Sequence, residues 1–311
     1  MTIVISTSLG NLKLAAPVLT ASGCAAAGKE LDQFFDITKI GGIVTKSIML
    51  EARSGRPTPR MAETPSGMLN SIGLQGPGID SFIEKDLAWL ANRGATTVVS
   101  IAGNNVEEFG RLAGKLRDHP AVAGIEINIS CPNVANRGLV FACNVGSATD
   151  VVTSVRRNVG PEMPLLAKLS PDVTDIVEIA RAVRDAGANG VSVINTVLGM
   201  VIDQKTLKPV LGGRTGGLSG PAIRPVAVRC VYQIHAALPD LPILGMGGIR
   251  NGKDALEFIA AGASAISVGT ATFGDPSAPM RIQNELTAEI ESRGFESLKE
   301  VIGIAHEKES N

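Results

Sequence analysis

The sequence predicts an α/β protein folded as a single (β/α)8 TIM barrel. Short runs rich in β-branched residues alternate with segments of apolar 3.6-residue periodicity, and eight such runs can be counted. Eight strand–helix units in about 250 residues match the usual size of a closed barrel. A doubly wound open sheet has the same alternation, so the count favours closure without requiring it.

The eight predicted core strands follow one another at spacings typical of βα units. They are Pro17–Ser22, Gly42–Ser47, Thr97–Ala102, Gly124–Ser130, Pro164–Ser170, Gly190–Thr196, Pro242–Gly247 and Ala265–Thr270. Between them, Asp172–Ala186 is typical of the predicted helices, with one apolar and one charged stripe and Gly187 as its C-cap. Ahead of the first strand, Thr2–Ser6 and Asn11–Leu14 flank a Leu-Gly turn and predict an amino-terminal hairpin.

Three of the connections that follow strands are long and rich in glycine and proline, namely Met49–Gly78, Pro132–Gly146 and Val197–Gly220. In a barrel these loops lie at the carboxyl ends of the strands, where active sites are found. We therefore expect them to cover the active site. No internal repeat or linker divides the chain, which predicts one domain over residues 1–311.

The composition narrows the classes of function. With 44% hydrophobic residues and a net charge of -1, the chain can bury a large core but lacks the charge excess that suits nucleic acid or an anionic membrane. Aromatic residues are scarce at 3%, which argues against a base-stacking surface. No apolar run approaches the ~20 residues of a membrane span, and the first residues lack the features of a signal peptide. We expect a cytoplasmic protein.

The cysteines and histidines do not suggest a metal site. Cys24, Cys131, Cys143 and Cys230 form no CxxC pair, and the chain has only three histidines. Zinc sites and iron–sulfur clusters need closely grouped thiolates or imidazoles. No metal is therefore expected in this chain. Cys230 is interpreted as a small buried hydrophobe, and no function is assigned to Cys24 or Cys143.

Polar side chains stand at the ends of the predicted strands. They are Ser22, Lys46, Ser100, Asn128, Lys168, Asn195 and Thr196. The set contains two lysines, amides and hydroxyls but no carboxylate, which suits an anionic ligand with amide-like edges. The last two strands end instead at Gly247-Gly248 and Gly269-Thr270, where barrels often bind phosphate through backbone N–H groups. Solvated strand ends and tight turns are the competing interpretations.

Cys131 follows the strand Gly124–Ser130, and Pro132 ends that strand, so the thiol lies in a loop at the active face. It can act as a nucleophile or exchange a proton. A nucleophile generally needs a base, and no histidine lies at a strand end. The surrounding residues therefore favour proton transfer, for which a thiol with an unperturbed pKa of ~8.5 is suited.

Long motifs in this chain resemble class 1 dihydroorotate dehydrogenases, and most closely the catalytic subunit of the B type. They are NISCPN, TPRMAETPSGMLNSIGLQGPG, KLSPDVTDI, INTVLGM, TGGLSGPAIRPVA, GMGGI and AISVGTATF. The resemblance implies a barrel that binds FMN and oxidises dihydroorotate to orotate in pyrimidine biosynthesis. Two departures stand out: Ser100 replaces the asparagine of many B-type relatives, and the loop Val134–Ser147 is unlike the family's usual version.

The resemblance also implies roles for individual residues. Those implied at the flavin are Ser22, Lys46, Ser47, Ser100, Asn128, Lys168, Ile194, Gly220, Gly247, Gly248, Gly269 and Thr270. Those implied at the substrate are Lys46, Asn70, Ser71, Ile72, Gly73, Leu74, Asn128, Asn133, Asn195 and Thr196. The implied catalytic residues are Cys131, Lys46 and Lys168. FMN would take a hydride at N5, Cys131 would take the proton from C5, and Lys168 would place positive charge near the reduced flavin.

The B-type resemblance further implies a partner subunit that carries FAD and a [2Fe–2S] cluster and passes electrons to NAD+, in a heterotetramer around a catalytic homodimer. The lack of clustered cysteines and of a dinucleotide fingerprint agrees with this division of labour. It agrees equally with an A-type homodimer that reduces fumarate. A dihydropyrimidine dehydrogenase-like flavoprotein, with the same barrel and a catalytic cysteine, and a non-catalytic flavin-binding barrel are the remaining alternatives.

Overall fold

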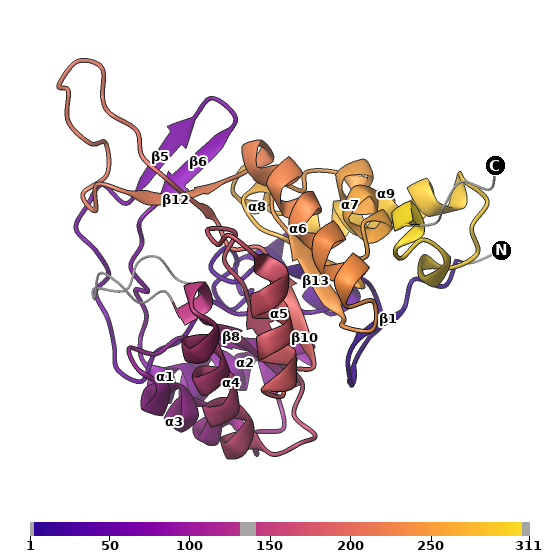
Figure 1. Ribbon diagram of the computed structural model, residues 1–311, viewed down its shortest axis with the longest axis horizontal. Coiled ribbons are helices and arrows are strands. Elements are labelled where there is room, and N and C mark those ends of the chain that lie inside the picture. Colours follow the sequence, from indigo (N-terminus) through magenta and orange to yellow (C-terminus); the bar gives the residue numbers. More distant parts are fainter. Residues whose placement is uncertain (1–2, 131–140, 307–311) are drawn as a thin grey trace.

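The computed structural model describes residues 3–130 and 141–306, and its centre is a sheet of eight parallel strands (Figure 1). In sheet order the strands are β3 (Val18–Thr20), β14 (Ala265–Val268), β13 (Ile243–Met246), β10 (Gly190–Val193), β9 (Leu165–Lys168), β8 (Gly124–Asn128), β7 (Thr97–Ile101) and β4 (Ile43–Val44). All eight predicted strands are confirmed. Each is shorter than predicted, because the last residues of most predicted strands already turn into the loops.

The two edge strands, β3 and β4, meet and close the barrel. Thr20 N donates to the carbonyl of Gly42 at 3.2 Å, and Val44 N donates to Thr20 Oγ1 at 3.0 Å. Glycine is required beside this seam, because a Cβ on Gly41 would lie 2.2 Å from the carbonyl oxygen of Ala16. The barrel is therefore confirmed in preference to a doubly wound open sheet.

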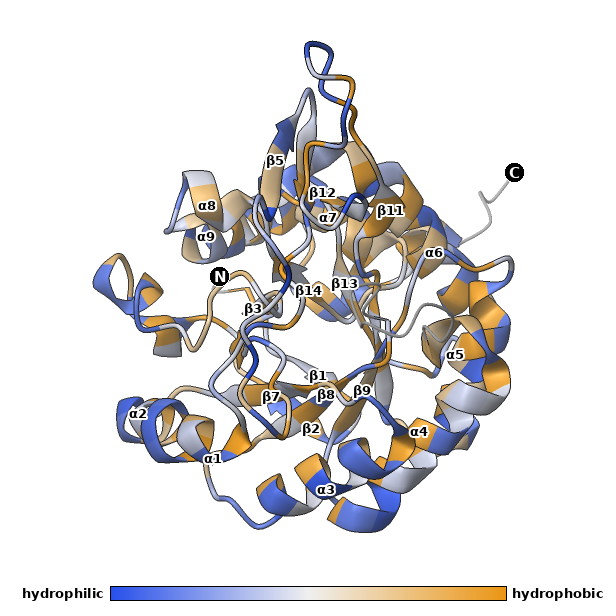
Figure 2. Ribbon diagram, turned by 90° about the vertical axis from the view of Figure 1, so that its left-hand side faces the viewer, coloured by the Kyte–Doolittle hydropathy of each residue, from blue (hydrophilic) through white to orange (hydrophobic). Residues whose placement is uncertain are grey.

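Helices surround the strands on the outside of the barrel (Figure 2). They are α1 (Ile79–Phe82) and α2 (Ala88–Arg93), joined by the π-turn η3 (Ile83–Leu87), then α3 (Val106–Leu116), α4 (Val145–Val159), α5 (Ile176–Asp185), α6 (Arg224–Ala237), α7 (Gly252–Ala260), α8 (Ala271–Gly274) and α9 (Ala278–Glu291). Short 3-10 turns are η1 (Leu31–Gln33), η2 (Ile37–Lys39), η4 (Phe141–Cys143), η5 (Pro221–Ile223), η6 (Leu298–Glu300) and η7 (Ile304–His306). Among the described residues, no helix combines the length and apolar character of a membrane span.

Helix α5 confirms the helix predicted within Asp172–Ala186, but it begins later than predicted. Asp175 is its N-cap, and the Asp175 carboxylate accepts a hydrogen bond from Val177 N at 2.8 Å. Gly187 follows the helix with a positive φ of 109°, a conformation that favours glycine. Capping by Asp175 thus sets the first turn, whereas the apolar stripe alone had suggested an earlier start.

The amino-terminal half of the barrel interior is apolar. One buried cluster there contains Leu9, Leu12, Leu14, Leu19, Val44, Val98, Leu166 and Leu244. Its first three members come from a hairpin of strands β1 (Thr7–Leu9) and β2 (Leu12–Leu14), which fills the amino end of the barrel. The hairpin is confirmed, but the prediction of Thr2–Ser6 as its first strand was wrong. Val4 instead forms a parallel bridge with Ser297, so the chain enters the hairpin later.

A second sheet, which the sequence did not predict, extends beyond the carboxyl end of the barrel (Figure 1). It is antiparallel, in the order β11 (Val197–Gly199), β12 (Gly216–Ser219), β6 (Gly67–Asn70), β5 (Met61–Thr64). Two of the three long loops supply these strands. They pair closely because Gly216 has no side chain: a Cβ there would lie 2.6 Å from the carbonyl oxygen of Asn70. In the third loop only residues from 141 onward are described.

Candidate active site

A cavity of about 510 Å³ lies at the carboxyl ends of the barrel strands, and β5 and β6 form part of its wall. This volume is within the range of about 300–1,000 Å³ that small-molecule sites occupy. The predicted site residues that line it are Ser22, Lys46, Ser47, Asn70, Ile72, Gly73, Leu74, Asn128, Lys168, Ile194, Asn195, Thr196, Gly220, Gly247, Gly248, Gly269 and Thr270. The fold therefore brings together residues from most of the chain at the predicted face.

Two described residues that were predicted at the site, Ser71 and Ser100, are fully buried and do not line the cavity. The Ser71 hydroxyl accepts a hydrogen bond from Arg56 Nη1 at 3.3 Å, so Ser71 supports the wall rather than facing a ligand. Cys131 and Asn133 lie outside the described residues, and the roles predicted for them stay predictions.

Glycine turns form one part of the wall. Gly220, Gly247 and Gly248 have positive φ angles of 90°, 132° and 78°. A Cβ on Gly248 would lie 2.8 Å from the carbonyl oxygen of Gly220, so a side chain at this position would press into the neighbouring turn. Close beside them, Thr270 Oγ1 donates to Ser219 Oγ at 2.8 Å. Turns of this kind allow a bound phosphate to approach the backbone.

An ion-pair network supports the glycine turn. Asp254, at the start of α7, pairs with Arg224, at the start of α6, and accepts a hydrogen bond from Arg250 N at 2.9 Å. Arg224 also pairs with Glu257 at 3.0 Å. Arg250 lines the cavity and adds a guanidinium that the sequence analysis did not assign to the site. The network therefore ties two helix starts to the turn between them.

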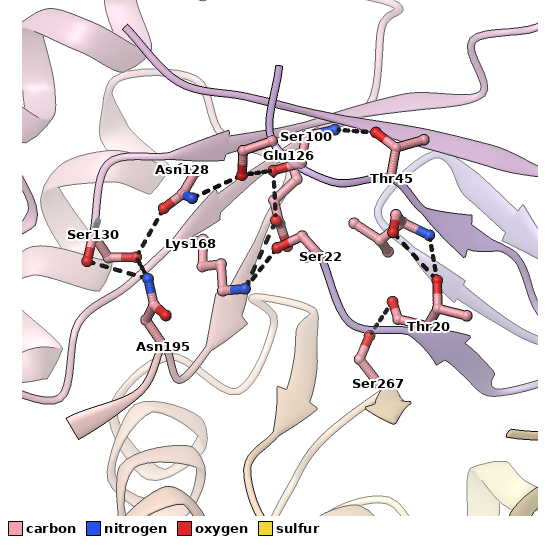
Figure 3. Close-up of polar contacts among 12 residues, drawn as sticks. Thr20, Ser22, Thr45, Ser100, Glu126, Asn128, Ser130, Lys168, Asn195 and Ser267 are labelled. Carbon is pink, nitrogen blue, oxygen red and sulfur yellow. Dashed lines mark hydrogen bonds and ion pairs between the residues drawn. The ribbon is translucent and has the colours of Figure 1, made fainter. Parts of the chain in front are cut away.

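Two lysines give the cavity a positive character. Lys168, on β9, has a side chain that is 5% exposed, and its Nζ donates to Ser22 Oγ at 2.8 Å (Figure 3). Lys46 lines the same cavity. Cys24 lies there as well: burial raises the pKa of its thiol, and the charges of Lys168 and Lys46 offset part of that rise. Such a cavity favours an anionic ligand.

A chain of hydrogen bonds runs behind the wall from Asn128 to Glu126 (Figure 3). Asn128 Nδ2 donates to Ser47 Oγ at 2.8 Å, Ser47 Oγ and Ser100 Oγ are 2.8 Å apart, and Ser100 Oγ donates to Glu126 Oε1 at 3.0 Å. Glu126 Oε1 in turn lies 3.9 Å from Lys168 Nζ. Residues from β7, β8, β9 and the segment that follows β4 thus fix one another in a single network.

Asn195 connects this network to the residue that precedes Cys131. Its Nδ2 donates to the carbonyl oxygen of Ser130 at 3.1 Å and to Ser130 Oγ at 2.8 Å. Ser130 Oγ donates to Asn128 Oδ1 at 3.2 Å. Ser130 is therefore held by two asparagines that both line the cavity, immediately before the predicted catalytic thiol.

The segment Asn70–Leu74 forms the opposite part of the wall. Its shape depends on positive φ angles at Gly73 (77°) and Leu74 (57°). Arg53 Nε donates to the carbonyl of Gly73 at 3.2 Å, and Arg56 N donates to the carbonyl of Ile72 at 3.0 Å. Arginines of the loop after β4 thus hold the residues that the resemblance places at the substrate.

The expectation that no carboxylate stands among the polar strand ends was too simple. Glu126 lies inside the barrel and is fully buried, two residues before the rim residue Asn128 on β8. The signal was present in the sequence, because Glu126, Asn128 and Ser130 alternate with three isoleucines and therefore share one face of the strand. Only the last residue or two of each strand had been assigned to the rim.

Comparison with known proteins agrees with the geometry. The family model for dihydroorotate dehydrogenase matches residues 4–290. The chain belongs to the dihydroorotate dehydrogenase family. It is 48% identical over 298 residues to a protein of Geobacter sp. (strain M21), covering 96% of this chain and 97% of that protein. It is 47% identical over 302 residues to one of Desulforamulus reducens, covering 97% and 98%. Both relatives are named dihydroorotate dehydrogenase B (NAD(+)), catalytic subunit.

Membership of this family implies a flavin, and the residues of the cavity suit one. A Cβ on Gly220, Gly247 or Gly248 would lie 2.7–2.8 Å from neighbouring protein atoms, so these turns require glycine, and such turns can bind a phosphate through backbone N–H groups. Ile194 and Met246 offer apolar surface to a ring system. Lys168 supplies a cation of the kind that stabilises a reduced flavin ring. These three features together suit the chemically different parts of a flavin that carries a phosphate.

Proposed function

We propose that this chain oxidises dihydroorotate to orotate, with FMN bound in the cavity, as the catalytic subunit of a cytoplasmic B-type dihydroorotate dehydrogenase. The observation that carries the proposal is the meeting of two lysines and three asparagines with the glycine turns in one cavity. A substrate with a carboxylate and two amide-like edges matches the lysine and asparagine side chains. The phosphate of FMN matches the glycine turns.

The residues divide between binding and orientation. Asn70, Asn128 and Asn195 present amides, which both donate and accept, to the edges of the pyrimidine ring. Lys46 attracts the substrate carboxylate, and Lys168 stabilises negative charge that develops at the flavin ring. FMN, when bound, supplies the acceptor for the hydride that leaves C6 of the substrate. Because Ser22 already holds Lys168, little reorganisation of that cation is needed during the reaction.

Cys131 is the proposed acceptor of the proton that leaves C5. Its neighbour in the sequence, Ser130, is anchored by Asn128 and Asn195, so the proposed substrate-binding amides hold the residue that precedes the proposed base. Holding base and substrate in a common framework favours proton transfer, which depends on close approach of the two groups.

The test of this proposal begins with the colour of the purified protein. We expect a yellow protein whose flavin bleaches on addition of dihydroorotate but not of dihydrouracil, which a dihydropyrimidine dehydrogenase would oxidise. In Cys131→Ser we expect FMN to stay bound while flavin reduction slows by roughly 10²–10⁴-fold. Reduction by the parent should quicken as the pH rises toward the thiol pKa. Equal rates in parent and variant would remove Cys131 from the mechanism, and absence of any bound flavin would contradict the proposal as a whole.

For the electron acceptor we propose NAD+, reached through a partner subunit that carries FAD and a [2Fe–2S] cluster, in a heterotetramer around a homodimer of this chain. The support comes from the relatives at 45–48% identity, which are named as NAD(+)-linked catalytic subunits. The isolated chain should then reduce NAD+ negligibly, and activity should appear when the partner is added. Rapid fumarate-dependent turnover by the chain alone would instead favour the A type.

A further inference from the structure

Glu126 is a buried carboxylate that the proposed chemistry does not use. Its side chain is completely inaccessible, and Glu126 Oε2 has no hydrogen-bond partner among the described residues. The only hydrogen bond that its carboxylate makes to those residues is the one that Oε1 accepts from Ser100 Oγ. Burying a carboxylate with so few partners is unfavourable, so its presence needs a physical explanation.

The nearest charge to Glu126 is the ammonium group of Lys168, 3.9 Å from Oε1, with side chains 0% and 5% exposed (Figure 3). Water is largely excluded here, so the two charges interact with little screening. Glu126 itself does not line the cavity, whereas Lys168 does. Any influence of the carboxylate on a bound ligand therefore passes through the electrostatic field and through Lys168.

Positioning of Lys168 does not explain the carboxylate. Lys168 Nζ already donates to Ser22 Oγ at 2.8 Å, which is a full hydrogen bond, whereas the 3.9 Å separation from Glu126 is too long for one. The ammonium group would keep its place without Glu126. What Glu126 adds is negative charge, placed 3.9 Å from the ammonium group of Lys168, which lines the cavity.

We propose that Glu126 is a counter-charge that limits how strongly Lys168 stabilises negative charge in the cavity. The inference rests on the proposed function, in which both the product carboxylate and the reduced flavin ring are anionic. Without this counter-charge, Lys168 would hold these anions more tightly. Glu126 weakens that hold, so that the product leaves and the flavin gives up its electrons to the next acceptor. Glu126 acts at a distance and is not a catalytic residue.

The decisive experiment compares Glu126→Gln with Glu107→Gln in the flavin-loaded chain. Glu126→Gln removes the buried charge but keeps the shape, whereas Glu107→Gln makes the same change of net charge at an exposed residue of α3. The midpoint potential of the flavin is measured by equilibration with a reference dye, and orotate affinity by titration of the flavin spectrum. For Glu126→Gln we expect the ratio of reduced to oxidised flavin at a fixed potential to rise about tenfold, equivalent to about 30 mV for a two-electron couple. Orotate should bind roughly three- to tenfold more tightly.

Glu107→Gln should leave both quantities within about twofold of the parent. A potential that stays unchanged or falls in Glu126→Gln overturns the proposal, and so does an equal shift in Glu107→Gln, because net charge rather than its position would then be responsible. If Glu126→Gln does not fold, Glu126→Asp moves the charge away by one methylene and should shift the potential the same way, by less; no shift overturns the proposal.

The two proposals fail in different ways. If the parent chain binds no flavin, the proposed function fails. Calorimetric titration of orotate into the parent and into Glu126→Gln then still tests the role of Glu126. Tighter orotate binding by the variant supports the counter-charge, and equal or weaker binding overturns it. If the parent binds flavin and bleaches with dihydroorotate but the variant's potential does not rise, only the counter-charge is refuted.

Discussion

Leu166 and Lys168 lie two residues apart on β9 and point to the same side of the strand, the barrel interior. Both are buried, with exposed fractions of 1% and 4%. Leu166 packs in the apolar cluster of the amino-terminal half with Leu9 and Leu244, whereas Lys168 bonds to Ser22 and faces Glu126. One step of about 6–7 Å along a strand thus separates the part of the barrel that stabilises the fold from the part that binds the ligand.

The difference has a physical cause. Burying a leucine contributes about 1.5–3 kcal/mol to stability, and it needs no partner. Burying an ammonium group is favourable only if it is paired and hydrogen-bonded, which Lys168 achieves with Ser22 and Glu126. The barrel tolerates such a polar layer at its carboxyl end because an apolar cluster, which includes Leu9, Leu12 and Leu14 of the hairpin, fills the amino-terminal half of its interior. Substitutions in the two layers should therefore separate stability from chemistry.

The largest effect is expected for Lys168→Met, which keeps the length of the side chain but removes the charge. Flavin reduction by dihydroorotate should slow by roughly 10²–10³-fold, the usual cost of losing one donor that stabilises developing negative charge. Stopped-flow absorbance of the flavin measures this rate. The exposed Lys253, on α7, provides the matched control. If Lys253→Met were to slow the reaction as much, the effect would be one of net charge and not of position.

In the apolar layer, Leu166→Ala should show the opposite pattern. The cavity left in a tightly packed interior should lower the free energy of unfolding by about 2–5 kcal/mol. The rate of flavin reduction per folded molecule should stay within about threefold of the parent, because Leu166 does not line the cavity. Urea denaturation gives the first quantity. Leu207→Ala, at a residue that is 78% exposed, should change stability by less than about 0.5 kcal/mol.

How much of this division could be predicted from the sequence depends on the element. The strands were predictable because alternating or continuous apolar runs mark them directly, and the pattern of β8 even contains Glu126. The antiparallel sheet of β5, β6, β11 and β12 was not, since its strands are three or four residues long and rich in glycine. Their pairing depends on contacts between loops far apart in the chain, such as Leu69 with Leu218.

The site followed the same rule. Residues at strand ends, such as Lys46 and Asn195, were predicted because barrel geometry gathers strand ends at one face, and both line the cavity. Ser100 and Ser71 were also predicted at ligands but are buried and do not line the cavity, because sequence position does not distinguish a residue that faces a cavity from one that supports it. Glu126 was missed because only the last residue or two of each strand were assigned to the rim, although the alternation in β8 places Glu126 on the same face as Asn128.

A smaller effect, on FMN affinity, is expected for a substitution in the glycine turn that lines the cavity. Gly248→Ala places a Cβ 2.8 Å from the carbonyl oxygen of Gly220 and forces alanine into a φ of 78°, which costs roughly 1–2 kcal/mol. FMN affinity, measured by quenching of its fluorescence, should fall about tenfold if the turn must shift. Gly274 lines the same cavity, and an added Cβ there meets nothing within 4 Å. Gly274→Ala should therefore bind FMN like the parent; an equal loss in both would point to general sensitivity of the cavity.

The smallest effect is expected for His235, whose protonation should change the stability of the fold. His235, near the end of α6, packs against the carboxyl-terminal segment, with its ring centroid 4.9 Å from that of His306, which itself stacks on Tyr232 at 3.9 Å. Burial, and next the neighbouring His306, lower the pKa of His235. The unfolded chain, with a histidine pKa near 6.5, therefore takes up a proton before the folded chain does as the pH falls.

The contribution of His235 to stability is thus fully present above pH ~6.5 and is lost as the pH falls below that value toward the lowered pKa. We expect the free energy of unfolding to fall by less than about 1 kcal/mol over this window on account of His235, because the ring is only partly buried. Urea denaturation of parent and His235→Gln at pH 7.5 and 5.5 measures the difference. If His235→Gln keeps the parental pH dependence, protonation of His235 does not contribute to the acid sensitivity of the fold.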